Sequence, residues 1–297
     1  AFSSVLSILP QLINTLLGII QQTFLADNGY VKEASAYVTH SGNLYVEVTQ
    51  HRPLLRLMSG GGNHFVTKEG ILFHPPQGGA FYAPVVSGSY KPLFPPTYEG
   101  SVAEFYETLY AEEDLKIEEL NAELSTVLRK RRASVRERSE YKKDKKKGRF
   151  ERESHWNQRK VGLELKMKEC DQKIAVLDGK VAQLEEKKHL IYKQKKKLQK
   201  SYEDFMNLIN FVTLVEESDF WSSEVVQFVA NTTSLGEIDL ALIPRSGNFV
   251  IEFGTLAERK EKLSKLGNFY DSCYSIVGEQ QYKQVDVRYD KQVICTK

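Results

Sequence analysis

Residues 163–205 read LELKMKECDQKIAVLDGKVAQLEEKKHLIYKQKKKLQKSYEDF, with mostly apolar side chains at alternating steps of four and three residues. This period is typical of helices that pack along a shared seam. The stretch therefore predicts a long helix that packs against a second helix. The seam positions, which continue beyond this stretch, are Leu163, Met167, Cys170, Ile174, Leu177, Val181, Leu184, Lys188, Ile191, Lys195, Leu198, Tyr202, Phe205, Ile209 and Val212.

A second helical pattern with the same spacing precedes this one. Its members are Ile117, Leu120, Leu124, Val127, Arg131 and Ser134. Residues 144–148, DKKKG, lie between the two patterns, and glycine is a strong helix breaker. We therefore predict a charged antiparallel coiled-coil hairpin over residues 106–203, whose arms of about 35 residues would reach about 50 Å at a rise of about 1.5 Å per residue.

Charge separates the predicted hairpin from the rest of the chain. Residues 101–205 carry 27 basic and 21 acidic side chains out of 41 and 39 in the whole sequence, so the flanks are expected to form another kind of structure. The tip is basic, because residues 129–149 hold 12 Lys or Arg against three acids. Three interpretations remain open for the tip: a solvated or protein-contacting end, a surface for anionic lipid, or a surface for nucleic acid.

The two flanks carry strand patterns of period two. Residues 44–48, 225–229, 237–242 and 249–253 are predicted strands, and residues 285–295 are predicted as one last strand that reaches the end of the chain. A helix is expected after Thr255, which forms a capping-box pattern with Glu258. Residues 1–26 predict an amphipathic core helix, with a membrane segment as the less favoured alternative because polar residues interrupt the apolar run. Residues 30–34 predict a short helix. The fold class is therefore α+β.

The sequence contains no recognisable catalytic or metal-binding pattern. The six histidines show no HExxH spacing, GxSxG is absent, and the three cysteines show no CxxC spacing. Residues 60–62, GGG, are predicted as a turn because no GKS or GKT follows them. We therefore expect no enzyme activity, no metal and no cofactor. Pairing of Cys273 with Cys295 is left open.

Two groups of motifs resemble known protein modules. Residues 28–34 (NGYVKEA), 44–48 and 50–53 (QHRP) resemble a POTRA module, in which a short helix leads into a hairpin. Residues 242–254, 262–270 and 285–297 resemble the β domain of the FtsQ/DivIB bacterial cell-division family, in the form found in Bacteroidetes. The resemblance implies a POTRA-like module over residues 1–60 without its first strand. A mixed or antiparallel β domain would follow in two parts, residues 61–105 and 204–297, interrupted by the hairpin.

The family resemblance also implies a function. It predicts a non-enzymatic divisome scaffold, with this chain in the periplasm as part of a single-pass inner-membrane protein whose membrane segment lies upstream. FtsB- and FtsL-like partners would add a strand to the C-terminal edge strand, as extended peptides do at unpaired sheet edges. Neither a small-molecule substrate nor nucleic acid is expected. The predicted partner-binding residues are Tyr289, Asp290, Lys291, Gln292, Val293 and Ile294.

Two alternatives to the divisome scaffold remain open. A POTRA-containing outer-membrane assembly or secretion protein would share the N-terminal motif, but no further POTRA repeat or barrel period follows residue 100. A nucleic-acid-binding coiled-coil protein would use the basic tip of the hairpin instead.

Overall fold

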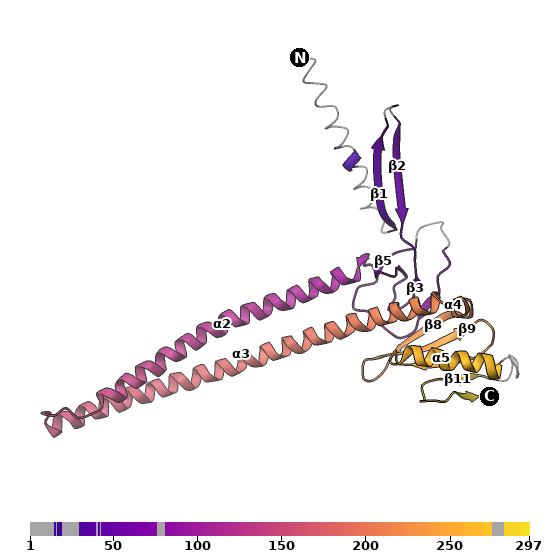
Figure 1. Cartoon of the computed structure of the whole chain (residues 1–297). Helices are drawn as coiled ribbons and strands as arrows, with labels where there is room; N and C mark the ends of the chain where they lie inside the picture. The colour runs from indigo at the N-terminus through magenta and orange to yellow at the C-terminus, as the bar shows by residue number, and fades with distance from the viewer. Residues whose placement is uncertain are drawn as a thin grey trace, which may run out of the picture. The chain divides into compact units, whose positions relative to one another are not determined.

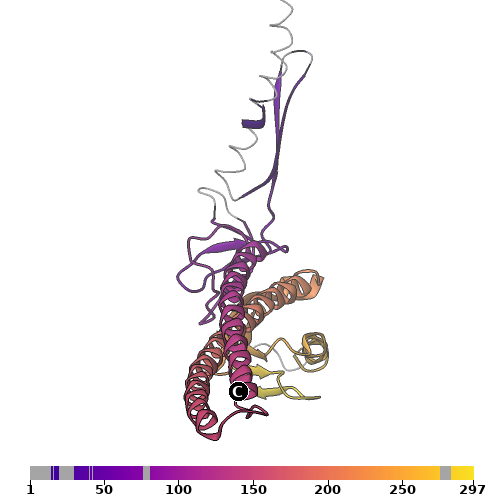
Figure 2. The ribbon, with the colours of Figure 1, turned by 90° about the vertical axis from the view of Figure 1, so that its left-hand side faces the viewer.

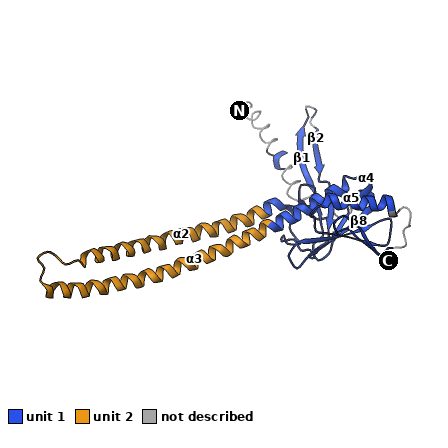
Figure 3. Cartoon of the chain, turned by 60° about the horizontal axis from the view of Figure 1, so that its bottom comes forward, with its two compact units in different colours: residues 1–105, 200–297 blue, residues 106–199 orange. Residues whose placement is uncertain are grey.

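The computed structural model divides the chain into two compact units (Figure 3). Unit 1 comprises Ala1–Phe105 and Lys200–Lys297, and unit 2 comprises Tyr106–Gln199. The structure describes residues 15, 17–19, 30–39, 41, 43–75, 81–274 and 282–297. Most of the helix predicted over residues 1–26 lies outside the described residues, and its four described residues are helical.

Two long helices joined by a turn, α2 (Val102–Asp144) and α3 (Glu153–Glu216), form unit 2 (Figure 1). Unit 2 contains α2 from Tyr106 to its end, the turn, and α3 from its start to Gln199. Polar side chains link the two helices across their interface at five places. In each of these pairs the two residue numbers add up to the same total, which shows that the helices run antiparallel in one register. The pairs are Asp114–Lys195, Asn121–Lys188, Arg131–Asp178, Arg138–Asp171 and Lys145–Glu164.

The interface between the helices follows the seam positions. Residues 161–200 are all described, and within them every side chain that is not exposed lies at a seam position, whereas all others are exposed. Cys170 and Leu184 are the most buried, at 2% and 6% exposure. Lys188 and Lys195 lie in the same row but donate to Asn121 (2.8 Å) and Asp114 (2.5 Å). The row of seam positions on α3 is therefore apolar from Leu163 to Leu184 and hydrogen-bonded toward its base.

Unit 1 contains a ten-stranded mixed sheet, and together with the helices it confirms the α+β class. Its strand order is β12-β11-β10-β9-β8-β6-β3-β4-β5-β7. The bounds are β3 (Leu55–Leu57), β4 (His64–Val66), β5 (Ile71–Phe73), β6 (Val85–Ser87), β7 (Gly100–Ser101), β8 (Val225–Thr232), β9 (Ile238–Pro244), β10 (Val250–Gly254), β11 (Gln284–Asp286) and β12 (Ile294–Thr296).

The segments before and after unit 2 meet inside this sheet. Strand β6 pairs in parallel with β8, with Val86 opposite Phe228. Gly88 then passes so close to Ala230 that a Cβ on it would lie 2.2 Å from the Ala230 oxygen. The sheet therefore closes between two parts of the chain that are separated by the whole hairpin.

The last turns of α3, from residue 200 onward, supply much of the core of unit 1. Phe211 is fully buried, and its ring centroid lies 6.0 Å from that of Phe228 on β8 and 4.6 Å from that of Phe253 on β10. Phe205 is also buried and lies edge-on to Phe94, at 5.3 Å. Two short elements, α4 (Asp219–Glu224) and α5 (Arg259–Phe269), and a π-helical turn, η1 (Tyr270–Tyr274), complete unit 1.

The short helix predicted over residues 30–34 is wrong. The segment is strand β1 (Val31–Val38), which pairs antiparallel with β2 (Leu44–Gln50) in a narrow two-stranded ribbon (Figure 2). Tyr37 stacks on Tyr45 at 5.6 Å and donates its hydroxyl to Glu47. A helix of five residues is marginal in water, and such cross-strand pairs stabilise the extended form. The segment assigned to the short helix of the POTRA motif is thus extended.

Other boundaries also differ from those expected. Strand β3 pairs with β4 and β6, so the sheet begins at Leu55, within the segment assigned to the POTRA-like module. The capping box is wrong, because Glu258 at the N-cap of α5 has a left-handed backbone (φ 53°) and makes no side-chain cap bond. The strands predicted around residues 225–229, 237–242 and 249–253 are confirmed as β8, β9 and β10. Residues 60–62 lie at a turn, as predicted, with positive φ at Gly60 and Gly61.

Candidate functional site

The residues predicted to bind a partner lie at and beside one edge of the ten-stranded sheet. Strand β12 is the last strand in the order and pairs antiparallel with β11, with Val285 opposite Cys295 and Asp286 opposite Ile294. Ile294 alone of the six predicted residues lies in this strand. The single last strand over residues 285–295 is therefore wrong: residues 287–293 form a loop in which Lys291 has a left-handed backbone (φ 57°).

The hydrogen bonds of β11 determine which groups of β12 face outward. The Val250 amide donates to the Lys283 carbonyl, and the Val287 amide donates to the Glu252 carbonyl, each at 3.0 Å. Odd-numbered residues of β11 therefore bond to β10, and since bonding alternates along a strand, Gln284 and Asp286 bond to β12. The residue opposite Val285, Cys295, consequently directs its own N–H and C=O away from the sheet.

An ion pair at the end of β11 holds the start of the loop. The Asp286 carboxylate is 7% exposed and accepts from Arg288 Nε at 3.0 Å, from Arg288 Nη2 at 2.5 Å and from the Arg288 amide at 3.0 Å. Burial alone would raise the pKa of Asp286, but the bonds from Arg288 outweigh it and hold that pKa below its usual value. This pair fixes the direction in which the loop leaves the sheet.

Helix α5 holds the same loop from the other side. The ammonium group of Lys265 donates to the Val287 carbonyl at 3.0 Å and to the Tyr289 carbonyl at 2.5 Å. These bonds fix the backbone at Tyr289, whose side chain is 48% exposed. The loop beside β12 is therefore fixed at two points, so an incoming strand would meet a preorganised surface.

A hollow of about 360 Å³ adjoins β12. Three of the predicted residues, Lys291, Gln292 and Val293, line it, whereas Tyr289, Asp290 and Ile294 do not. Phe269 and Tyr282 form an aromatic wall, with ring centroids 5.9 Å apart. The other lining residues are Lys265, Asn268 and Cys295.

The part of this hollow that α5 provides was not predicted from the sequence. Lys265 and Phe269 are four residues apart and therefore lie on one helical face, which is a signal that the sequence did contain. Together with β12, this face can hold an extended peptide by main-chain bonds and accept one apolar or aromatic side chain. Lys291 adds a positive charge at the rim.

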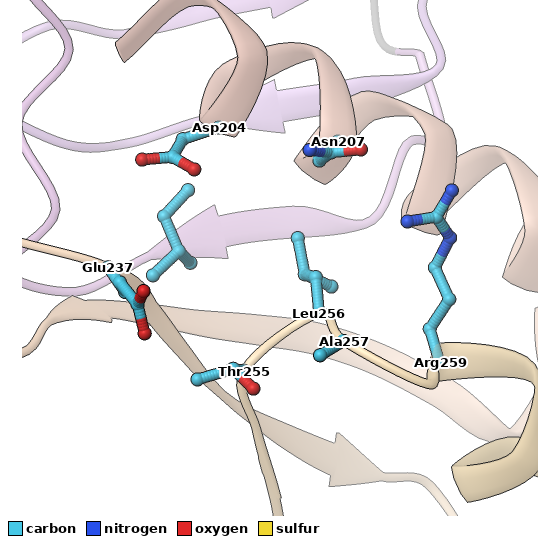
Figure 4. Close-up of a pocket in the computed structure, with 8 residues that line it drawn as sticks. Asp204, Asn207, Glu237, Thr255, Leu256, Ala257 and Arg259 are labelled. Atoms are coloured by element: carbon cyan, nitrogen blue, oxygen red, sulfur yellow. The ribbon is translucent and has the colours of Figure 1, made fainter. Parts of the chain in front are cut away.

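A second hollow, of about 320 Å³, lies between the end of α3 and the β10–α5 connection (Figure 4). Asp204 and Asn207 extend into it from α3, with Glu237 and Arg259 on its other sides. Burial, and to a smaller extent the nearby Glu237 carboxylate, raises the pKa of Asp204. Lys200 Nζ lies 3.6 Å from Glu237 Oε1. The remaining lining residues are Ile238, Thr255, Leu256 and Ala257.

Two histidines form a third cluster on unit 1. His64 is 2% exposed, and its ring centroid lies 4.7 Å from that of His74. His74 Nδ1 lies 2.7 Å from Glu99 Oε1, and His74 Nε2 lies 3.1 Å from the Pro96 carbonyl oxygen. Burial, followed by the neighbouring His74, lowers the pKa of His64. This cluster joins β4 to the segment that precedes α2.

The described residues contain neither a helix suited to span a membrane nor a cluster suited to hold a metal ion. Within that part of the chain, no helix combines the length and apolar character needed to cross a membrane. Groups of three or more His, Cys, Asp or Glu side chains arranged for a metal ion are likewise not found among the residues described.

The C-terminal part of the chain is similar to a known protein family. Residues 190–296 match the family described as FtsQ/DivIB, C-terminal related. The match covers a little more than a third of the chain and includes the end of α3, strands β8 to β12 and α5. No curated protein matches the chain.

Proposed function

Since residues 190–296 match the FtsQ/DivIB C-terminal related family, we propose that this chain is a non-enzymatic scaffold of the bacterial cell-division machinery. In this proposal the chain is the periplasmic part of a protein anchored in the inner membrane by an upstream segment. It acts by holding other division proteins, of the FtsB and FtsL kind, at the site of septum formation. Neither a small-molecule substrate nor a cofactor takes part.

The observation that carries the proposal is the position of β12 at the end of the strand order among the described residues. The last strand of a sheet can take up an extended peptide as a further strand through main-chain hydrogen bonds. The loop beside this strand is held by Arg288 and Lys265, so little order has to be gained on binding. The edge therefore combines main-chain bonding capacity with a rigid border.

The hollow beside β12 supports a particular kind of partner. Its aromatic wall of Phe269 and Tyr282 suits an apolar or aromatic side chain of an added strand. Lys291 is exposed and has no ion-pair partner among the described residues, so it favours an acidic group near that side chain. The expected partner segment is thus extended, with an aromatic residue close to an acidic one.

A proline substitution at the edge tests strand addition. Cys295 is the middle residue of β12, and proline there disturbs the geometry of the strand and has no N–H. We therefore expect Cys295→Pro to weaken binding of an FtsB-like peptide at least tenfold. Isothermal titration calorimetry with the full chain gives the affinity, and thermal unfolding checks that the melting temperature changes by no more than a few degrees.

Cys295→Ala is the matched control, because it removes the same side chain from the hollow but keeps the amide. Full affinity in the alanine variant and lost affinity in the proline variant support the edge as the site. Equal affinities in both variants would exclude strand addition at β12. Co-purification from native membranes followed by mass spectrometry identifies the partners independently of the edge.

A further inference from the structure

The turn at the tip of unit 2 is held in shape by one arginine. Arg159 on α3 donates to the carbonyl oxygens of Asp144 and Lys146 and pairs with Glu151 through both Nε (2.9 Å) and Nη2 (2.5 Å). Glu151 in turn accepts from the Gly148 amide at 3.0 Å. Although the turn is exposed, its backbone is therefore fixed in a definite conformation.

This arrangement pairs one of the two carboxylates of the tip, that of Glu151, and leaves an excess of positive charge. Residues 142–152 contain seven basic and two acidic side chains. Nearby carboxylates pair with two of the seven, through the contacts Lys145–Glu164 and Lys147–Glu153. Five exposed basic side chains have no ion-pair partner among the described residues: Lys142, Lys143, Lys146, Arg149 and Arg152.

An aromatic side chain projects from the middle of these cations. Phe150 is 95% exposed, the highest exposure among the large apolar side chains described, and it lies between Arg149 and Arg152 in the turn. Trp156, by contrast, is half-buried, with Lys147 and Lys160 within 6 Å of its ring. The turn thus has an aromatic residue that supports it and another that points into solvent.

We propose that the hairpin tip, residues 142–152, binds the surface of a membrane that contains anionic phospholipid. Each unpaired cation near such a surface is attracted to it, and an aromatic side chain among these cations enters the headgroup region, where aromatic rings are favoured. The fixed turn presents both features at once. This binding is separate from partner binding at β12 and does not depend on it.

The arrangement of the charges favours a membrane over nucleic acid. Nucleic-acid binding by an exposed arm usually requires cations that follow the phosphate backbone, together with several aromatic side chains for stacking. Here the unpaired cations surround one turn and a single exposed ring. A compact cationic patch with one apolar centre suits a flat anionic surface with an apolar interior.

Vesicle co-sedimentation with the full chain tests the proposal. We expect the protein to bind phosphatidylcholine vesicles that contain about one third phosphatidylglycerol, and not vesicles of phosphatidylcholine alone, at about 0.1 M salt. The triple variant Lys146→Gln, Arg149→Gln, Arg152→Gln should bind about a hundredfold more weakly, at roughly fivefold per charge. Phe150→Ala should bind about tenfold more weakly.

Two control variants separate the tip from general charge and apolar effects. Lys180→Gln, Lys187→Gln and Lys193→Gln remove three exposed lysines of the arm that have no ion-pair partner in the described part of the chain. Leu165→Ala truncates an apolar side chain that is 60% exposed. Both controls should bind the anionic vesicles as the parent does. Circular dichroism checks that all variants remain helical.

Three results would overturn the proposal. One is equal loss of binding in the tip and arm charge variants, which would indicate unspecific attraction. Another is undiminished binding of Phe150→Ala, which would mean that the ring does not enter the headgroup region. The third is duplex DNA binding tighter than vesicle binding and lost in the tip variant, which would assign the tip to nucleic acid.

Discussion

At the scale of single residues, Gly254 sets the geometry of the C-terminal edge. It ends β10 with a φ of +76°, and a Cβ on it would lie 2.7 Å from Arg288 Cγ and 2.9 Å from Arg288 Cδ. The arginine that holds Asp286 therefore crosses directly over a position that has no side chain. Any other residue here would push the Arg288 stem away from its partner.

Gly254→Ala should accordingly destabilise unit 1. We expect the free energy of unfolding, measured with urea, to fall by about 2–3 kcal/mol, because a positive φ strains alanine and the arginine stem has to shift. Gly236→Ala is the matched control, since Gly236 has a similar φ of +78° with nothing within 4 Å of its Cβ position. In Gly236→Ala the free energy of unfolding should fall only by the cost of the strained backbone, about 1 kcal/mol. Equal losses would mean that the contact with Arg288 does not matter.

We expect His64 to make the stability of the protein depend on pH. Its folded-state pKa lies below the usual value because the ring is buried and close to His74. As the pH falls from about 7.5 to about 5.5, the unfolded chain binds a proton at this residue before the folded chain does, so stability should decrease. Glu99 titrates below that window, because bonds from His74 outweigh its burial and lower its pKa.

His64→Gln should reduce this decrease, since glutamine takes up no proton. Urea unfolding at the two pH values measures the change in each variant. His189→Gln, at an exposed position on α3, is the control and should keep the pH dependence of the parent. A parent-like dependence in His64→Gln would exclude His64 as its source.

At the scale of elements, the long helices could be predicted from a periodic pattern in the sequence, whereas a short strand such as β1 could not. The seam of α3 repeats over many turns, so local exceptions such as Lys188 do not obscure it. Strand β1 has no such redundancy: its helix-forming Lys, Glu and Ala residues are kept extended by contacts such as Tyr37 to Tyr45. Because these contacts join different segments, a local pattern cannot reveal them.

The candidate site was predictable only in part, for a similar reason. The expectation that the chain's last strand lies at a sheet edge agrees with β12, but the loop that precedes it was read as strand. Val285, Val287 and Tyr289 alternate as in a strand, yet the backbone leaves the sheet after Asp286, where Arg288 and Lys265 hold it. The hollow was missed because its walls come from three segments, including Phe269 and Tyr282.

At the scale of the whole molecule, the sheet of unit 1 does not need the hairpin to close. Strands β6 and β8 pair directly, and the core residues that α3 contributes to unit 1 begin at Phe205. Inside unit 2, Asp114 and Lys195 are in contact, so the two arms lie close together at their bases. The part of the hairpin beyond this contact is therefore an insertion between two segments of unit 1.

Replacing residues 112–196 with a short Gly/Ser linker should therefore leave unit 1 folded. We expect a cooperative unfolding transition with a melting temperature within a few degrees of the parent, because a flexible linker adds little closure entropy. Differential scanning calorimetry gives the transition. A variant that keeps this linker and also carries Phe211→Ala is the destabilised control, since Phe211 packs on Phe228 and Phe253. If the variant with the linker and without Phe211→Ala does not unfold cooperatively, unit 1 requires the hairpin.

The single antiparallel register of α2 and α3 also restricts how the length of the hairpin can change. An insertion or deletion in one arm alone would shift every later pair, including Arg131–Asp178 and Arg138–Asp171, out of alignment. Removing seven residues from each arm at facing positions keeps all pairs matched and shortens the arms by about 10 Å. Length can therefore change only in coordinated steps on both arms, which makes the hairpin a spacer with discrete sizes.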